Sequence, residues 1–208
     1  MTFSTIDLEL LQLYNEPHRR YHSVFHVLEM LEMHRTGETR GLVLGDYRMP
    51  DFGLYESLFQ TAVIAHDCVY QIGKPKAWNE NESFRAWETL GIVGPSNLAY
   101  DLIAVTINHD PQRWNYYDQT RNLMIRHMSD LDMAPLGASR EEYDRNSANL
   151  KAEFMLGGVD EEAYEIGRRA FLTKTLEEPR IFYTDQFQQL DKPARDNMTR
   201  ALEPGYGL

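Results

Sequence analysis

The stretch YESLFQTAVIAHDCVY, residues 55–70, is apolar around almost its whole helical circumference and ends in a histidine, an aspartate and a short apolar tail. A helix that is apolar on every side belongs in the core of a protein, so we expect this stretch to be the buried central helix. His66 and Asp67, at the end of that helix, are ionisable groups that are costly to bury unless they are partnered or bind a metal ion. The alternative is structural, with His66 bonded to a carbonyl group and Asp67 capping a neighbouring helix.

Helical patterns continue on both sides of the central stretch. Ser4, with Asp7 three residues later, has the pattern of a capping box and predicts a first helix that ends near Pro17. Apolar residues recur with the helical period over 24–31, which predicts a second helix before the turn-rich stretch 37–53. Further helices are expected over 81–90, 97–107, 121–128, about 160–172 and about 193–202. Ser139 and Glu142 form a second capping-box pattern, which predicts a helix that continues to about 154. The short run RIFYT, residues 180–184, is ambiguous, so the predicted fold class is an all-α, single-domain helical bundle.

Length and charge limit the kinds of protein that this can be. The chain of 208 residues is expected to form one domain, 1–208, with a metal-site core over about 14–135 and C-terminal helices over about 139–203. The net charge of −11 repels phosphate backbones and argues against a nucleic-acid polymer as partner. A small phosphorylated substrate is still compatible, because a bound cation and a few arginines can reverse the local field.

The expected location follows from absent signals. No apolar run approaches the roughly 20 residues that span a bilayer, and the N-terminus lacks the pattern of a secretory signal. A single cysteine, Cys68, excludes an internal disulfide. We expect a cytoplasmic protein without a membrane partner, and the sequence does not predict its oligomeric state.

Four side chains from distant parts of the chain form a candidate metal-ligand set. His26, His66 and Asp67 supply two imidazoles and a carboxylate, and SDLDM adds either Asp130 or Asp132. Two carboxylates in apolar surroundings repel each other unless a cation compensates them. A mixed nitrogen and oxygen set without cysteine suits Mn, Fe, Co, Ni, Mg or Zn, and four ligands leave positions for water and substrate.

These residues, in this order, resemble the HD superfamily of metal-dependent phosphohydrolases, whose signature is a histidine, then a His-Asp pair, then a distant aspartate. The match is closer to its bacterial group of predicted metal-dependent HD phosphohydrolases. The fragments that carry the resemblance run from Tyr14 to about 202: YNEPHRRYHSVFHVLEML, AVIAHDCVY, NENES, VTINHD, SDLDMAPLG, LKAEF, GRRAFL and ARDN. The resemblance implies an all-α fold, makes His26, His66 and Asp67 metal ligands, and favours Asp132 over Asp130.

The segment YHSVFH is similar to the Tyr-His-Asn-x-x-His segment of class I cyclic-nucleotide phosphodiesterases. That resemblance implies that His22 is the general acid, while His26 binds the metal. Both histidines would project from one face if they shared a helix. Ser23 stands where asparagine is usual, and Lys151 stands where the bacterial group usually has arginine.

Other residues have expected roles around this set. Arg19 lies three residues before His22 and is expected to contact phosphate, and Asp67 is expected to help orient the attacking water. Glu80 and His109 are expected to lie around the ligands or at a second metal ion. The loops 74–78 and 111–117 are expected to set specificity, and Arg168 and Arg195 match family positions.

The expected function is therefore a metal-dependent phosphohydrolase that acts on a small phosphoester, with a nucleotide as one candidate, by attack of metal-activated water. One alternative is a catalytically silent HD module that binds a metal or a nucleotide. Another is a purely structural helical protein.

Overall fold

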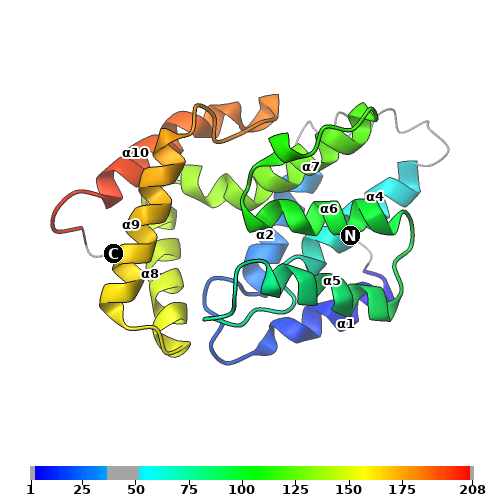
Figure 1. The fold of residues 1–208 in the computed structure, drawn as a ribbon, viewed down its shortest axis with the longest axis horizontal. Coiled ribbons are helices and arrows are strands. Elements are labelled where there is room, and N and C mark those ends of the chain that lie inside the picture. Colours follow the sequence, from blue (N-terminus) through cyan, green and yellow to red (C-terminus); the bar gives the residue numbers. More distant parts are fainter. Residues whose placement is uncertain (1–2, 37–51, 207–208) are drawn as a thin grey trace.

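The computed structural model describes residues 3–36 and 52–206, and within these ranges every regular element is a helix (Figure 1). The α-helices are α1 (Thr5–Gln12), α2 (Val24–Thr36), α4 (Phe52–Ala65), α5 (Trp78–Leu90), α6 (Ser96–Ala104), α7 (Gln119–Met133), α8 (Arg140–Leu156), α9 (Glu161–Glu177) and α10 (Asp191–Ala201). Short 3₁₀ helices are η1 (Leu13–Asn15), η2 (Val105–Ile107), η3 (Pro111–Arg113), η4 (Ala134–Gly137) and η5 (Asp185–Leu190). The all-α prediction is confirmed.

The stretch expected at the centre of the core does lie there. Helix α4 packs against α1, α2, α5 and α6, and Phe59, Ala62 and Ile64 on its different sides are completely inaccessible to solvent. Figure 1 shows α8, α9 and α10 gathered on one side of the molecule, with α1, α4, α5 and α6 on the other and α7 running between them. Since α4 is buried, His66 and Asp67 just beyond its end enter the interior.

The two helix starts predicted from capping boxes are confirmed, and the helix expected from about 160 is also capped at its start. Ser4 and Asp7 form a reciprocal capping box at α1, and Ser139 and Glu142 form another at α8. The Asp160 carboxylate caps α9 by accepting from the Ala163 amide. These starts are predictable because capping depends on residues only three positions apart.

Two helix boundaries matter for the site. Helix α2 begins at Val24, where the sequence pattern predicts it, so His22 lies in the bend before this helix and His26 lies in its first turn. Helix α7 continues to Met133, five residues beyond the predicted 128, so Asp130 and Asp132 are both helical. The turn-rich prediction for 37–53 falls largely on 37–51, which lie outside the described residues.

The ambiguous run 180–184 is not a strand. Its amides at Tyr183 and Thr184 donate to the buried Asp130 carboxylate, which replaces the partner strand that such a segment would otherwise need. Among the helices of the described ranges, none has the length and apolar character needed to cross a membrane.

Candidate functional site

The ends of three helices bring four of the predicted ligands together. His26 comes from the first turn of α2, His66 and Asp67 directly follow α4, and Asp132 lies in the last turn of α7. Donor atoms of His26, His66 and Asp67 all lie within 4.8 Å of one another. The Asp132 Oδ1 atom is 3.1 Å from His26 Nε2 and 3.7 Å from His66 Nε2. The four residues predicted from three separated fragments therefore converge on one point.

The orientation of the His66 ring suits a metal ligand. Its Nδ1 donates to the Val63 carbonyl oxygen at 2.8 Å, which leaves the lone pair of a neutral ring on Nε2. That Nε2 atom is buried and has no hydrogen-bond partner, although an Asp67 oxygen lies 3.1 Å away outside hydrogen-bonding direction. An imidazole nitrogen held in this way can donate its lone pair to a metal ion.

The charges of the cluster are strongly interdependent. Burial disfavours the charged form of His66, but the Asp67 and Asp132 carboxylates outweigh burial and hold the pKa of His66 well above its ordinary value. Burial likewise disfavours the two carboxylates, and the neighbouring histidines overcome it, so the pKa of each carboxyl group is lowered. The two acids therefore require positive charge beside them, which either protons on the histidines or a cation can supply.

The residues fit a divalent cation. The set offers two imidazole nitrogens and two carboxylates, of which His66 is fully buried and His26 and Asp67 are nearly so. Asp132 is the most accessible, with 14% of its side chain exposed. This donor chemistry suits Mn, Fe, Co, Ni, Mg or Zn, and the exposed side leaves room for water and substrate.

His109 joins the cluster from the far side of Asp132. Its Nε2 atom lies 2.8 Å from Asp132 Oδ2, and its backbone has φ of +52°, a conformation uncommon outside glycine. Glu80 is half-buried, and burial followed by the charge of Asp67 raises the pKa of its carboxyl group. The structure therefore places His109 in contact with a predicted ligand, and Glu80 within electrostatic reach of the cluster.

His22 is held by a glutamate that the sequence did not single out. Its Nδ1 atom lies 2.5 Å from Glu153 Oε1, and Glu153 Oε2 accepts from the backbone amides of residues 20, 21 and 22. Glu153 is completely buried within α8, and its role could not be predicted because it lies 131 positions from His22. Burial opposes charge on His22, but the hydrogen bond that the ring donates to Glu153 and the negative charge of the nearby Asp67 outweigh burial and raise the pKa of His22.

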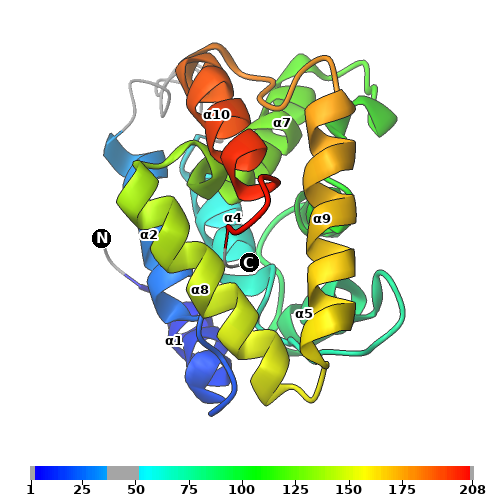
Figure 2. The same ribbon diagram turned by 90° about the vertical axis from the view of Figure 1, so that its left-hand side faces the viewer.

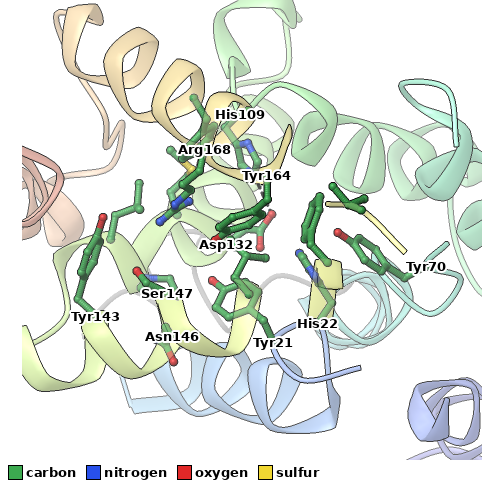
Figure 3. A pocket seen from close by; sticks show the side chains of 18 of the residues that line it. Tyr21, His22, Tyr70, His109, Asp132, Tyr143, Asn146, Ser147, Tyr164 and Arg168 are labelled. Atoms are coloured by element: carbon green, nitrogen blue, oxygen red, sulfur yellow. Dashed lines mark hydrogen bonds and ion pairs between the residues drawn. The ribbon is translucent and has the colours of Figure 1, made fainter. Parts of the chain in front are cut away.

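A cleft of about 450 Å³, lined in part by residues of α8 and α9, opens beside this arrangement (Figure 3). Figure 2 shows the course of these two helices. His22, His109 and Asp132 line one part of it, and Tyr21 and Tyr70 pack around His22. The loops 74–78 and 111–117, expected to set specificity, do not line this cleft; the walls come instead from η4, α8 and α9. Which segments form the walls of the cleft depends on how the C-terminal helices pack against the rest of the molecule.

The structure contradicts the expected role of Arg19. Its side chain is 1% exposed, and its guanidinium group donates to Glu16 and to the backbone carbonyl oxygens of His22, Asp67 and Cys68. No donor is left to meet a phosphate. Arg19 instead ties the His22 segment to the His-Asp segment, which positions both sides of the site.

The choice between the two aspartates of α7 is also clear in the structure. Asp130 is completely buried, away from the histidines, and accepts from the amides of Tyr183 and Thr184 and from the Thr184 hydroxyl. Asp132 faces the histidines. The alternative assignment of Asp130 as a ligand is therefore wrong, because its carboxylate anchors the 180–184 segment. Arg195, which the sequence resemblance singled out, pairs with Asp191 and therefore has a structural role.

Comparisons of the chain with protein-family models, with curated proteins and with solved structures gave no match.

Proposed function

We propose that the protein is a metal-dependent phosphohydrolase that acts on a small phosphoester, with nucleotides as candidate substrates. The observation that carries this proposal is the cleft, where a hydrogen-bonded His22–Glu153 pair and the accessible face of a two-histidine, two-carboxylate cluster lie side by side. Its volume of about 450 Å³ is in the range of sites for small molecules rather than polymers.

In this proposal His26, His66, Asp67 and Asp132 bind a divalent ion, with His109 fixing the second oxygen of Asp132. A bound ion would supply Lewis acidity, which activates water and compensates charge on phosphoryl oxygens. One oxygen of Asp67 can bind the ion while the other accepts a hydrogen bond from the attacking water.

His22 supports the proposal as the proton donor to the leaving oxygen. Glu153 engages Nδ1, which leaves Nε2 to face a ligand, and 17% of the His22 side chain is exposed. The raised pKa keeps more of the ring protonated at neutral pH than an isolated histidine. The nearby carboxylate stabilises the charged ring and fixes its orientation.

The test combines metal analysis of the purified protein with hydrolysis of a phosphoester panel that includes nucleotides. We expect stoichiometric metal and turnover in the wild type, and loss of both in Asp67→Ala and His26→Ala. His22→Ala should keep its metal and lose turnover, by about 100-fold or more if the histidine is a general acid.

Two results would contradict the proposal. A metal-loaded protein that hydrolyses no phosphoester would favour the silent metal- or nucleotide-binding module. A His22→Ala variant without metal would show that His22 is a ligand rather than a proton donor.

A further inference from the structure

The cleft extends beyond the metal-ligand cluster into a second polar region. Figure 3 shows Tyr143 and Ser147 on the side away from His22 and Tyr70, with Arg168 between them and the centre of the cleft. Tyr143 and Ser147 come from α8, and Tyr164 and Arg168 come from α9. We call Tyr143, Ser147, Tyr164 and Arg168 the distal polar group.

The hydroxyl oxygens and the Arg168 Nε atom of the distal polar group are buried and make no hydrogen bond of normal geometry, although Arg168 and Ser147 lie close enough to the Tyr143 hydroxyl to oppose the rise in its pKa. Tyr143, Ser147 and Tyr164 are 2%, 7% and 4% exposed, yet the hydroxyl oxygens of all three make no hydrogen bond of normal geometry. The Arg168 Nε atom is also buried without a partner. Buried polar groups are nearly always satisfied, and four orphaned ones that line one cleft are explained if a ligand completes their hydrogen bonds.

The charge of Arg168 indicates the kind of ligand. Arg121, Arg195 and Arg200 each pair with an aspartate, whereas Arg168 forms no ion pair within the ranges 3–36 and 52–206. Its charge still reaches the neighbouring tyrosines: burial raises the pKa of Tyr143 and of Tyr164, and Arg168 opposes the rise in both. In a chain with a net charge of −11, an unpaired arginine inside a cleft stands out.

The donor pattern favours an oxyanion over a nucleobase. Arginine only donates hydrogen bonds, and the three hydroxyls can each donate as well, so the group suits a ligand that only accepts. The rest of the cleft is lined largely by apolar or aromatic side chains, among them Leu136, Leu150, Phe154 and Phe171. A compact apolar or aromatic body fits such walls.

We propose that the distal polar group binds a second oxyanion, carboxylate or phosphoryl, so that the substrate carries two negatively charged groups joined by a compact apolar or aromatic body. The assignment of the first group to the metal cluster rests on the proposed function. The assignment of the second rests on the distal polar group itself.

The test measures anion binding without hydrolysis. Chelator-treated protein is titrated with inorganic phosphate or with benzoate, and binding is followed by the melting temperature, for the wild type, Arg168→Gln and Arg169→Gln. Arg169 is the matched control, because it is exposed on the same helix and the charge change is the same. We expect one of the anions to stabilise the wild type and the control, with binding to Arg168→Gln weakened about 10-fold or more.

The response identifies the group, since stabilisation by phosphate assigns a phosphoryl group and stabilisation by benzoate assigns a carboxylate. The proposal is overturned if neither anion binds, or if Arg168→Gln binds the anion as well as the control does. Hydrolysis without any anion response contradicts only this proposal, whereas an Arg168-dependent anion response without hydrolysis contradicts only the proposed function.

Tyr164→Phe separates a ligand-binding role from a structural one. Removing an unsatisfied buried hydroxyl should leave the melting temperature of the free protein unchanged or higher, while anion affinity falls. A lower melting temperature together with unchanged anion affinity would show that the hydroxyl is structural and would overturn its assignment.

Discussion

At the scale of single residues, the site depends on which atom of each side chain is already engaged. Asp130 and Asp132 are two positions apart on α7, which turns their side chains about 200° from each other. One carboxylate therefore anchors the 180–184 segment and the other faces the histidines. Arg19 shows the same principle, because every donor of a nominally reactive side chain is used for positioning.

Asparagine substitutions should separate the two aspartates. Asp132→Asn should weaken metal binding by at least about 10-fold, since it removes a charged ligand. Asp130→Asn should keep the metal and lower the free energy of unfolding by about 1–3 kcal/mol, because the amide nitrogen cannot accept the hydrogen bonds that both carboxylate oxygens receive from Tyr183 and Thr184. Metal stoichiometry and urea unfolding measure both effects, and a metal-free Asp130→Asn of normal stability would contradict the assignment.

Glu153→Gln should disturb the His22 segment. The amide cannot compensate an imidazolium, so the pKa of His22 should fall toward its ordinary value or below it, as followed by NMR titration. Weaker acceptance from the amides of residues 20–22 should cost about 1–3 kcal/mol of stability. Glu141→Gln, at an exposed position in the first turn of α8, is the control and should change neither quantity by a comparable amount.

At the scale of helices, a few buried polar contacts hold specific elements together. A buried pair links α2 to α7, where His127 Nε2 lies 3.0 Å from His34 Nδ1 and His127 Nδ1 accepts from Gln186 of η5. Burial first, and then the charge of His34, lowers the pKa of His127 well below its ordinary value. His127 is therefore neutral in the folded protein.

This pair should make the fold acid-sensitive. Below about pH 6.5 the unfolded chain takes up a proton on His127 and the folded protein does not, so acid favours unfolding. The contribution is complete above that pH and is lost as the pH falls, by up to about 1.4 kcal/mol per pH unit. Urea unfolding between pH 7 and 5 should show a shallower dependence for His127→Gln, and an unchanged slope would contradict this explanation.

Replacing either of two glycines with alanine should change the stability of the protein, in opposite directions. A Cβ at Gly137 in η4 would lie 2.7 Å from Leu190 Cβ and 2.9 Å from the Leu190 carbonyl oxygen, so Gly137→Ala should cost about 1–3 kcal/mol. A Cβ at Gly167 within α9 meets nothing within 4 Å, so Gly167→Ala should stabilise the protein by about 0.5–1 kcal/mol. Equal effects in thermal unfolding would show that the approach of η4 to Leu190 is not tight.

At the scale of the whole molecule, the candidate metal ligands connect segments that are far apart in sequence. His26, the His66–Asp67 pair and Asp132 join α2, the end of α4 and α7, while Glu153 reaches back from α8 to the segment before α2. An ion bound by the folded state alone would therefore stabilise the fold globally.

Metal should raise the melting temperature and a chelator should lower it. At a free ion concentration 100 times the dissociation constant, the gain is about 2.7 kcal/mol. His66→Ala should remove most of this response, because it deletes the most buried ligand. A wild-type melting temperature that is the same with metal and with chelator would support the purely structural alternative.

The all-α class, the buried place of α4, the helix starts at Ser4 and Ser139, and the candidate set of ligands could be predicted from the sequence. These features depend on local patterns: the helical period, capping boxes between residues three positions apart, and the free-energy cost of burying ionisable groups at the end of an apolar helix.

Which side chains of this set meet could not be predicted and depends on the packing of the helices. This packing turned Asp132 rather than Asp130 toward the histidines, used Arg19 for positioning, brought Glu153 to His22, and left Arg168 unpaired in the cleft. Each outcome depends on contacts between residues far apart in the chain. Such contacts follow from how the helices pack against one another, and the pattern along any single helix does not contain that information.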